Sequence, residues 1–310
     1  MPRLSSLGIR NKNLFSNHFL ENYVPQMEDF KNSTDHERIF QKIKEIREDF
    51  GDLHDELKES QLENRFFRKI FDLIFPHYEV QAPTRQRDVP DYAFFATKRD
   101  LKEALKSKDD LNFYANAILV GEVKPWGKKL DIVGKNKWDK HKNPSFQIWL
   151  YLHNTQKGWG ILSNGQKWRL YRRDKNIDEY YEVDLDSLLQ EDDVENFKYF
   201  YYFFRKKAFL PNPSGKIFLQ EVHEGSLELA KEIGESLTNN VYKAMKVLAD
   251  GFFGWHENGL SKNDPRDLKM VQDSTMILLY RILFLLYAED MGLLELDNIH
   301  YRDHFSIYSL

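Results

Sequence analysis

The period of the hydrophobic pattern changes at Pro76, and this change limits the folds that the chain can adopt. Before Pro76, apolar residues recur at helical spacing over residues 40–50 and again over residues 53–75. Proline has no N–H to continue a helix, so the second helix should end there. After it, short apolar runs flanked by polar residues predict strands over residues 78–82, 92–96 and 113–123. The chain is therefore expected to be of the α/β class.

A further helix and a hairpin are predicted after these strands. Residues 145–153 form the helical pattern, and residues 158–163 and 167–171 have the pattern of two strands. The pair Asn164-Gly165 between these strands favours a tight turn, because both residues tolerate positive φ. The predicted order is helix, three strands, helix and hairpin. This order indicates a mixed sheet flanked by helices.

Changes in pattern divide the chain into three predicted units. Residues 1–52 form an N-terminal helical segment, and residues 53–210 contain the predicted sheet. Two prolines and a glycine interrupt regular structure over residues 211–215 and mark the second boundary. Residues 211–310 are expected to be entirely helical.

The C-terminal unit contains an apolar segment over residues 276–288 that Arg281 interrupts. The segment is shorter than the roughly eighteen apolar residues that a membrane span requires. We expect it to be the central helix of a bundle, or to pack on a further domain. The N-terminal residues 1–4 also lack the apolar stretch of a signal peptide. The sequence therefore predicts a cytoplasmic protein with no membrane association.

The composition limits the kinds of functional site. Because cysteine is absent, the chain has no disulfides, and any metal must be bound by oxygen or histidine. The ten histidines show no metal-ligand spacing, and no glycine-rich phosphate loop is present. The net charge of -4 gives no sign of nucleic-acid binding, but residues 124–142 carry seven lysines against two aspartates. This stretch is either an ordinary solvated loop or a surface that neutralises backbone phosphates.

Two carboxylates and a lysine lie where predicted strands begin or end. Asp91 opens the second predicted strand, and Glu122 and Lys124 end the third. Because side chains alternate along a strand, Glu122 and Lys124 should share one face while Val123 turns into the core. Carboxylates are the ligands that Mg²⁺ prefers, and the Val123 carbonyl is placed to complete the metal shell. Such a site can hydrolyse a phosphodiester, with the lysine close to the attacking water.

Pro90-Asp91 and Glu122-Val123-Lys124 are each common patterns when taken alone. Their joint occurrence, with the helix and hairpin in this order, resembles the PD-(D/E)xK nuclease superfamily. The closest resemblance is to the N-terminal nuclease region of type IIG enzymes, in which one chain carries restriction and modification. The resemblance covers nearly the whole chain. The stretches that carry it are residues 14–21, 90–95, 122–126, 147–151, 160–171 and 280–290.

The resemblance implies a restriction-endonuclease-like (PD-(D/E)xK) mixed sheet, followed by an all-α connector. The implied activity is that of a Mg²⁺-dependent, site-specific deoxyribonuclease, in which Mn²⁺ can replace Mg²⁺. Asp91 and Glu122 would bind the metal, and Lys124 would position or activate the attacking water. Glu63 would bind the metal through water, although a glutamate on an amphipathic helix is as often simply solvated.

The resemblance also implies which residues contact double-stranded DNA. Gln147 and Tyr151 match a Gln-x-x-x-Tyr helix motif, and their spacing of four places both on one helix face. The alternative for this pair is a buried tyrosine beside an incidental glutamine. The remaining expected DNA contacts are the loop lysines Lys128, Lys129, Lys135 and Lys137.

The chain departs from the type IIG pattern in one respect. No Asn-Pro-Pro-Tyr type motif of a methyltransferase is present, so no S-adenosylmethionine site is expected within these residues. A methyltransferase and a target-recognition region are expected C-terminal to this chain or in a partner. Two other functions fit the sequence: a catalytically silent DNA-binding or assembly module of the same fold, and the nuclease domain of a type I restriction subunit. The C-terminal helical segment favours type IIG, since a motor subunit should continue into a helicase.

Overall fold

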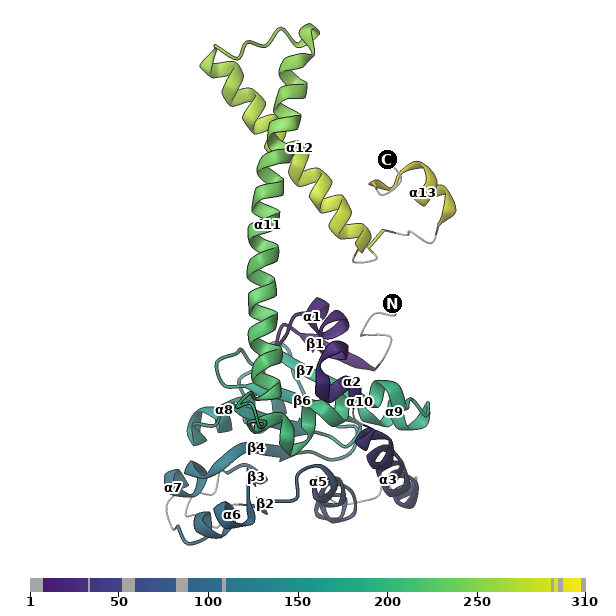
Figure 1. The fold of residues 1–310 in the computed structure, drawn as a ribbon, viewed down its shortest axis with the longest axis vertical. Coiled ribbons are helices and arrows are strands. Elements are labelled where there is room, and N and C mark those ends of the chain that lie inside the picture. Colours follow the sequence, from purple (N-terminus) through teal and green to yellow (C-terminus); the bar gives the residue numbers. More distant parts are fainter. Residues whose placement is uncertain are drawn as a thin grey trace. The chain divides into compact units, whose positions relative to one another are not determined.

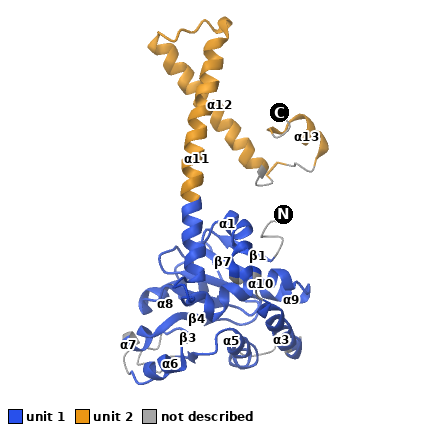
Figure 2. Ribbon diagram, viewed as in Figure 1, with its two compact units in different colours: residues 1–229 blue, residues 230–310 orange. Residues whose placement is uncertain are grey.

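The computed structural model describes residues 8–32, 34–51, 59–81, 89–107, 110–290, 293–294 and 298–307. The chain forms two compact units, residues 1–229 and residues 230–310 (Figure 2). The first unit is a mixed α/β domain built on one seven-stranded sheet. The second unit is helical.

The sheet is open and mixed, with the strand order β1-β7-β6-β5-β4-β3-β2 (Figure 1). Neighbouring strands are antiparallel, with the exception of β4 and β5, which are parallel. A parallel pair needs a crossover connection, and helix α8 provides it here. The strands are β1 (Ile9–Lys12), β2 (Tyr78–Val80), β3 (Tyr92–Phe95), β4 (Ala117–Val123), β5 (Trp159–Ser163), β6 (Lys167–Arg172) and β7 (Tyr180–Asp184).

Helices cover both faces of the sheet. In the first unit they are α1 (Asn17–Asn22), η2 (Val24–Gln26), α2 (Glu28–Asn32), α3 (Asp35–Phe50), α4 (Glu59–Leu62), the π-helix η4 (Glu63–Phe67), α5 (Arg68–Ile74), α6 (Lys98–Ala104), α7 (Asp110–Ala115), α8 (Pro144–Thr155), α9 (Leu185–Gln190), α10 (Val194–Phe204) and η5 (Lys206–Phe209). The long helix α11 (Phe218–Gly254) begins in the first unit and ends in the second.

The two faces of the sheet have separate cores. On one face, Phe71 of α5 lies 4.8 Å from both Tyr92 and Phe94 and 5.4 Å from Trp168, measured between ring centroids. Helices α3, α9 and α10 complete this aromatic core. Helices α6, α7 and α8 cover the other face, over residues such as Val120. In Figure 1, α7 and α8 lie to the left of the sheet, and α3, α9 and α10 to its right.

Most of the predicted elements are confirmed, and the differences concern one strand boundary and two additional strands. The predicted third strand begins only at Ala117, because Phe113 and Tyr114 lie on α7 and bury their rings from there. Strands β1 and β7 were not predicted. Strand β1 makes residues 9–12 part of the sheet. The predicted helix start near residue 53 lies outside the described residues.

The second unit consists of the end of α11, η6 (His256–Asn258), α12 (Pro265–Asp290) and α13 (Ile299–His304). Helix α12 is longer than the apolar run seen in the sequence, and its apolar side chains are largely exposed. Tyr280 is 65% exposed and Phe284 is 66% exposed, so the expected burial in a bundle is absent in the described chain. By length and composition alone, Pro265–Glu289 is the one described helical segment that could cross a membrane.

Candidate active site

Asp91 and Glu122 face each other across the ends of β3 and β4. Tyr92 pairs with Gly121 in the antiparallel register, which places the preceding residue Asp91 opposite Glu122. The Asp91 backbone N–H donates to Glu122 Oε2 at 3.3 Å. In return, the Val123 backbone N–H donates to Asp91 Oδ2 at 3.0 Å. The two carboxylates are therefore held together by the strands' own backbone.

Gly121 allows the two strands to pack at this point. A Cβ atom added at Gly121 would lie 2.9 Å from the ring of Phe94 and 3.3 Å from the Cβ of Tyr92. Real side chains do not approach so closely, so another residue would push these rings away. The absence of a side chain at Gly121 therefore allows the strand register that brings Asp91 beside Glu122.

The predicted alternation at the end of β4 is confirmed. Val123 is buried in the aromatic core on one face of the sheet. Glu122 lies on the other face, where the Lys124 Nζ forms an ion pair with its Oε1. The side chains of Glu122 and Lys124 are only 2% and 11% exposed. A carboxylate and an ammonium group are thus fixed side by side at the edge of the α8-covered face.

The electrostatics of this pair are unusual. Burial and then the neighbouring charge of Asp91 raise the pKa of Glu122 to about 8, while Lys124 acts in the opposite direction. The Glu122 carboxyl group thus lies beside the charge of Asp91, with the Lys124 ammonium as its ion-pair partner, in a poorly solvated position. A further cation would favour ionisation of Glu122. Perturbed groups of this kind are frequent at functional sites.

Glu63 lies at the start of the π-helix η4. Its Oε1 accepts hydrogen bonds from Arg68 Nε at 3.2 Å and Nη2 at 2.9 Å. Burial, followed by the charge of Glu63, raises the pKa of Tyr92, which is the residue after Asp91. Glu63 is thus near the strand that carries Asp91, but it is paired with a guanidinium. Within the described residues, no group of three histidine, aspartate or glutamate side chains is arranged to hold a metal.

Gln147 and Tyr151 lie on one face of α8, as their spacing predicts. Gln147 Nε2 donates to the Tyr151 hydroxyl at 3.0 Å. Tyr151 is 3% exposed and packs with Ile148 and Leu152 on the face of the sheet that carries Glu122. Gln147 is half-buried. Of the two, only Gln147 is accessible enough to contact a ligand, and Tyr151 holds its amide in place.

We expect Tyr151→Phe to lower the free energy of unfolding by about 1 kcal/mol, because it removes a hydroxyl that accepts a partly buried hydrogen bond. Urea denaturation measures this change. The ring remains in the core, so any additional loss of DNA affinity would report the orientation of the Gln147 amide. Gln147→Ala should reproduce that loss of affinity with a smaller effect on stability.

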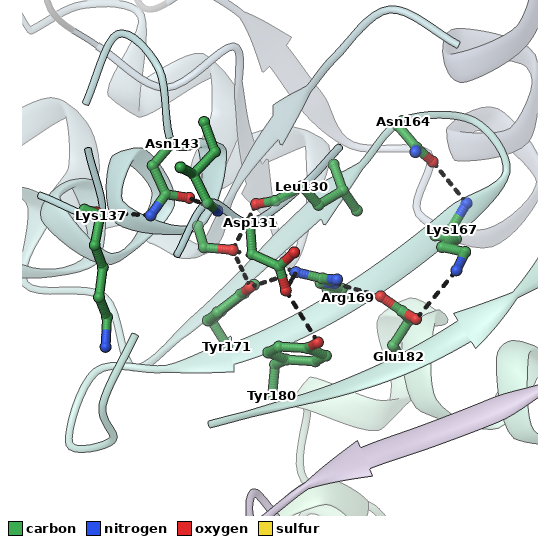
Figure 3. A network of polar contacts seen from close by, with 12 residues as sticks. Leu130, Asp131, Lys137, Asn143, Asn164, Lys167, Arg169, Tyr171, Tyr180 and Glu182 are labelled. Carbon is green, nitrogen blue, oxygen red and sulfur yellow. Dashed lines mark hydrogen bonds and ion pairs between the residues drawn. The ribbon is translucent and has the colours of Figure 1, made fainter. Parts of the chain in front are cut away.

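The lysine-rich loop between β4 and α8 is anchored to the sheet by a buried polar network (Figure 3). Arg169 of β6 forms ion pairs with Glu182 and, at 3.2 Å, with Asp131 of the loop. The Tyr180 hydroxyl donates to the same Asp131 Oδ2 at 3.2 Å. The Ser145 hydroxyl donates to the Leu130 carbonyl at 2.6 Å. The loop therefore has a defined course.

Asparagine side chains fix two further points of this loop. Asn143 Nδ2 donates to the Lys137 carbonyl at 2.6 Å, and Asn164 Nδ2 donates to the Lys128 carbonyl at 2.8 Å. Of the four lysines predicted to contact DNA, Lys137 pairs with Asp178. The other three make no ion pair within the described part of the chain and project into solvent; they are Lys128, Lys129 and Lys135.

Sequence reasoning did not identify Arg169, Asp131 or Glu182 as parts of the site region. A signal was present, because Arg169 interrupts the otherwise apolar run of β6 between Trp168 and Leu170. A buried arginine needs carboxylate partners, but the sequence does not reveal which ones. Those partners come from β7 and from the loop, 13 and 38 residues away.

The chain matches no protein-family model, no curated protein and no solved structure.

Proposed function

We propose that this chain carries a Mg²⁺-dependent endonuclease domain that hydrolyses phosphodiester bonds in DNA. The observation that carries the proposal is the group of Asp91, Glu122 and Lys124 at the adjoining ends of two strands. The two carboxylates are linked through backbone N–H groups, and the lysine contacts the more buried one. Two carboxylates and one ammonium at the adjoining ends of two strands are suited to binding a hard cation and orienting water.

The order of elements supports the finer proposal of a restriction-endonuclease-like core of the PD-(D/E)xK type. Helix α5 is followed by the antiparallel strands β2, β3 and β4, then by the crossover helix α8 and the parallel strand β5. Asp91 immediately precedes β3, Glu122 is the penultimate residue of β4, and Lys124 immediately follows β4. This order of elements and carboxylates supports the proposal of a PD-(D/E)xK core.

The residues present fit a magnesium ion. In proteins, Mg²⁺ is bound by one or two carboxylates, and water and substrate phosphate oxygens complete its shell, so a cluster of three protein acids is not required. Asp91 and Glu122 would hold the ion, with the Val123 carbonyl as a third donor. The raised pKa of Glu122 fits this role, because a cation offsets the cost of ionising a buried carboxyl. When bound, the ion would supply Lewis-acid stabilisation of the phosphate charge.

The protein's own residues would carry out the remaining steps. The Lys124 ammonium is held beside Glu122, where it can donate a hydrogen bond to the attacking water and orient its oxygen toward phosphorus. As the new P–O bond forms, the attacking water gives up a proton to solvent, the bond from phosphorus to the leaving sugar oxygen breaks, and that oxygen takes up a proton from solvent. Gln147 would steady the DNA from α8. The solvated loop lysines would neutralise its backbone phosphates.

The wider proposal is a type IIG restriction-modification system acting in the cytoplasm. The substrate would be double-stranded DNA. The sequence departs from a complete type IIG enzyme in lacking a methyltransferase motif, so methylation and target recognition would reside in a region C-terminal to this chain or in a partner. The exposed apolar side chains of α12 are compatible with such a neighbour.

Calorimetric titration of Mg²⁺ or Mn²⁺ tests the proposal. The wild-type chain is compared with the isosteric Asp91→Asn/Glu122→Gln double variant, at pH 8.5 and in the presence of a short DNA duplex. We expect one class of metal binding in the wild type and at least a tenfold weaker binding in the double variant. Equal binding in both proteins, or none in either, would refute the nuclease proposal and favour a catalytically silent DNA-binding or assembly module.

A further inference from the structure

An aromatic strip runs along the solvent side of α8 and onto the lysine-rich loop. It consists of Trp138, Phe146, Trp149 and His153. Ring centroids are 5.4 Å apart for Trp138 and Phe146, 5.9 Å for Phe146 and Trp149, and 3.9 Å for Trp149 and His153. The three rings on α8 recur at spacings of three and four residues, so they share one helix face.

This face is not the one that α8 packs against the sheet. The buried face of the helix carries Ile148 and Leu152, which press against Gly160 of β5. The members of the aromatic strip are half-buried or exposed. Trp138 is 60% exposed, whereas Trp168 in the core is fully buried. Core packing therefore does not explain why a tryptophan occupies position 138.

Hydrogen bonds hold the strip in place. The Trp149 indole Nε1 donates to the Lys175 carbonyl at 3.1 Å, and His153 Nδ1 is hydrogen-bonded to the Trp149 carbonyl at 2.8 Å. The backbone beside Trp138 is fixed through the Asn143 bond to the Lys137 carbonyl. The rings of Trp149 and His153 and the backbone that carries Trp138 are therefore ordered in advance, which lowers the entropic cost of binding a flat ligand.

Positive charge accompanies the exposed ring. The Nζ of Lys137 lies 5.4 Å from the centroid of the Trp138 ring. Of the other lysines within four residues of Trp138 in the sequence, Lys135 makes no ion pair within the described part of the chain, whereas Lys142 pairs with Asp139, as Lys137 does with Asp178. Sites for single-stranded nucleic acid combine two components, aromatic rings and lysines. The bases stack on the rings, and the phosphates contact the cations. An unpaired base exposes the face needed for stacking, whereas a base in a duplex does not.

We propose that the aromatic strip binds an unpaired segment of nucleic acid, with Trp138 as the principal stacking platform. This inference extends the proposed function, because it gives the DNA-cleaving domain a contact for a single-stranded or locally opened region of its substrate. Binding at the strip needs neither a metal nor the carboxylates of the candidate active site. The two proposals can therefore be tested separately.

The test is a fluorescence-anisotropy titration of a labelled twelve-nucleotide oligothymidine, with EDTA present. Trp138→Ala is compared with Trp255→Ala, which removes a tryptophan of almost equal exposure, 59%, from the second unit. We expect Trp138→Ala to weaken binding about tenfold and Trp255→Ala to leave it unchanged. The affinity of Trp138→Ala for a blunt duplex of the same length should be less than twofold weaker than that of the wild type. Lys135→Ala should instead reduce the dependence of affinity on salt.

Unchanged oligothymidine affinity in Trp138→Ala would overturn the proposal, as would an equal loss of affinity for the duplex or the absence of binding in the wild type. Thermal unfolding of each variant verifies that the fold is retained, and Trp138→Phe, which keeps a stacking face, should recover part of the affinity. If stacking is found without metal binding, only the nuclease proposal fails. If metal-dependent binding is found without stacking, only the inference about the strip fails.

Discussion

Lys124→Met should slow metal-dependent DNA cleavage by a factor of about 10²–10⁴, the range associated with a group that positions or activates a reacting water. The reason is geometric. Lys124 is held against Glu122 with little exposure, so its ammonium is fixed beside the place where a metal and its water would lie. Methionine keeps much of the chain length and removes the charge. Single-turnover cleavage of a supercoiled plasmid with Mg²⁺ or Mn²⁺ measures the effect.

The same variant should bind the metal at least as tightly as the wild type at pH 8.5. Removing a positive charge beside a cation site removes repulsion, whereas Asp91→Asn removes a ligand and should lower both metal affinity and cleavage. Lys102→Met, on the exposed side of α6, is the matched control and should change neither quantity. If Lys124→Met cleaved as fast as the wild type, Lys124 would have a structural role only.

The local part of the site could be predicted from the sequence because it depends on local geometry. Alternation along β4 alone places Glu122 and Lys124 on one face, and the ion pair confirms it. The approach of Asp91 to Glu122 depends on the register of β3 against β4, 31 residues apart in the chain. The resemblance implied that Asp91 and Glu122 share one site, but only the paired strands determine their register. The raised pKa of Glu122 could be predicted even less, since it depends on burial by residues from several elements.

Other features could not be predicted because they depend on distant partners. Strand β1 has one buried apolar residue, Ile9, and acquires its strand character by pairing with β7 about 170 residues later. The contact of Glu63 with Arg68 spans five residues, which matches the wider turn of a π-helix rather than the spacing of an α-helix. Hydropathy showed that α12 is apolar. It could not show that those side chains would remain exposed.

Glu122→Gln should change how stability depends on pH. The pKa of Glu122 is raised from its usual value near 4.5 to about 8, so between these values the folded protein retains a proton that the unfolded chain has lost. The free energy of unfolding of the wild type therefore falls as pH rises through this window. Glutamine cannot ionise, so the variant lacks this loss. Relative to that of the wild type, the free energy of unfolding of the variant should increase by about 2–4 kcal/mol as the pH rises from 5 to 9.

Urea denaturation with EDTA at several pH values measures the difference between the two proteins, in which the contributions of titrating groups that do not interact with Glu122 cancel. Glu103→Gln, at an exposed position on α6, should follow the wild type at every pH. Millimolar Mg²⁺ should restore stability to the wild type at pH 9, because a ligand that binds only the folded state stabilises it, and should leave Glu122→Gln unchanged. A constant difference between wild type and variant from pH 5 to pH 9 would mean that Glu122 ionises normally. Ionising the buried Glu122 carboxyl would then cost little, and this argument for a bound cation at the site would fail.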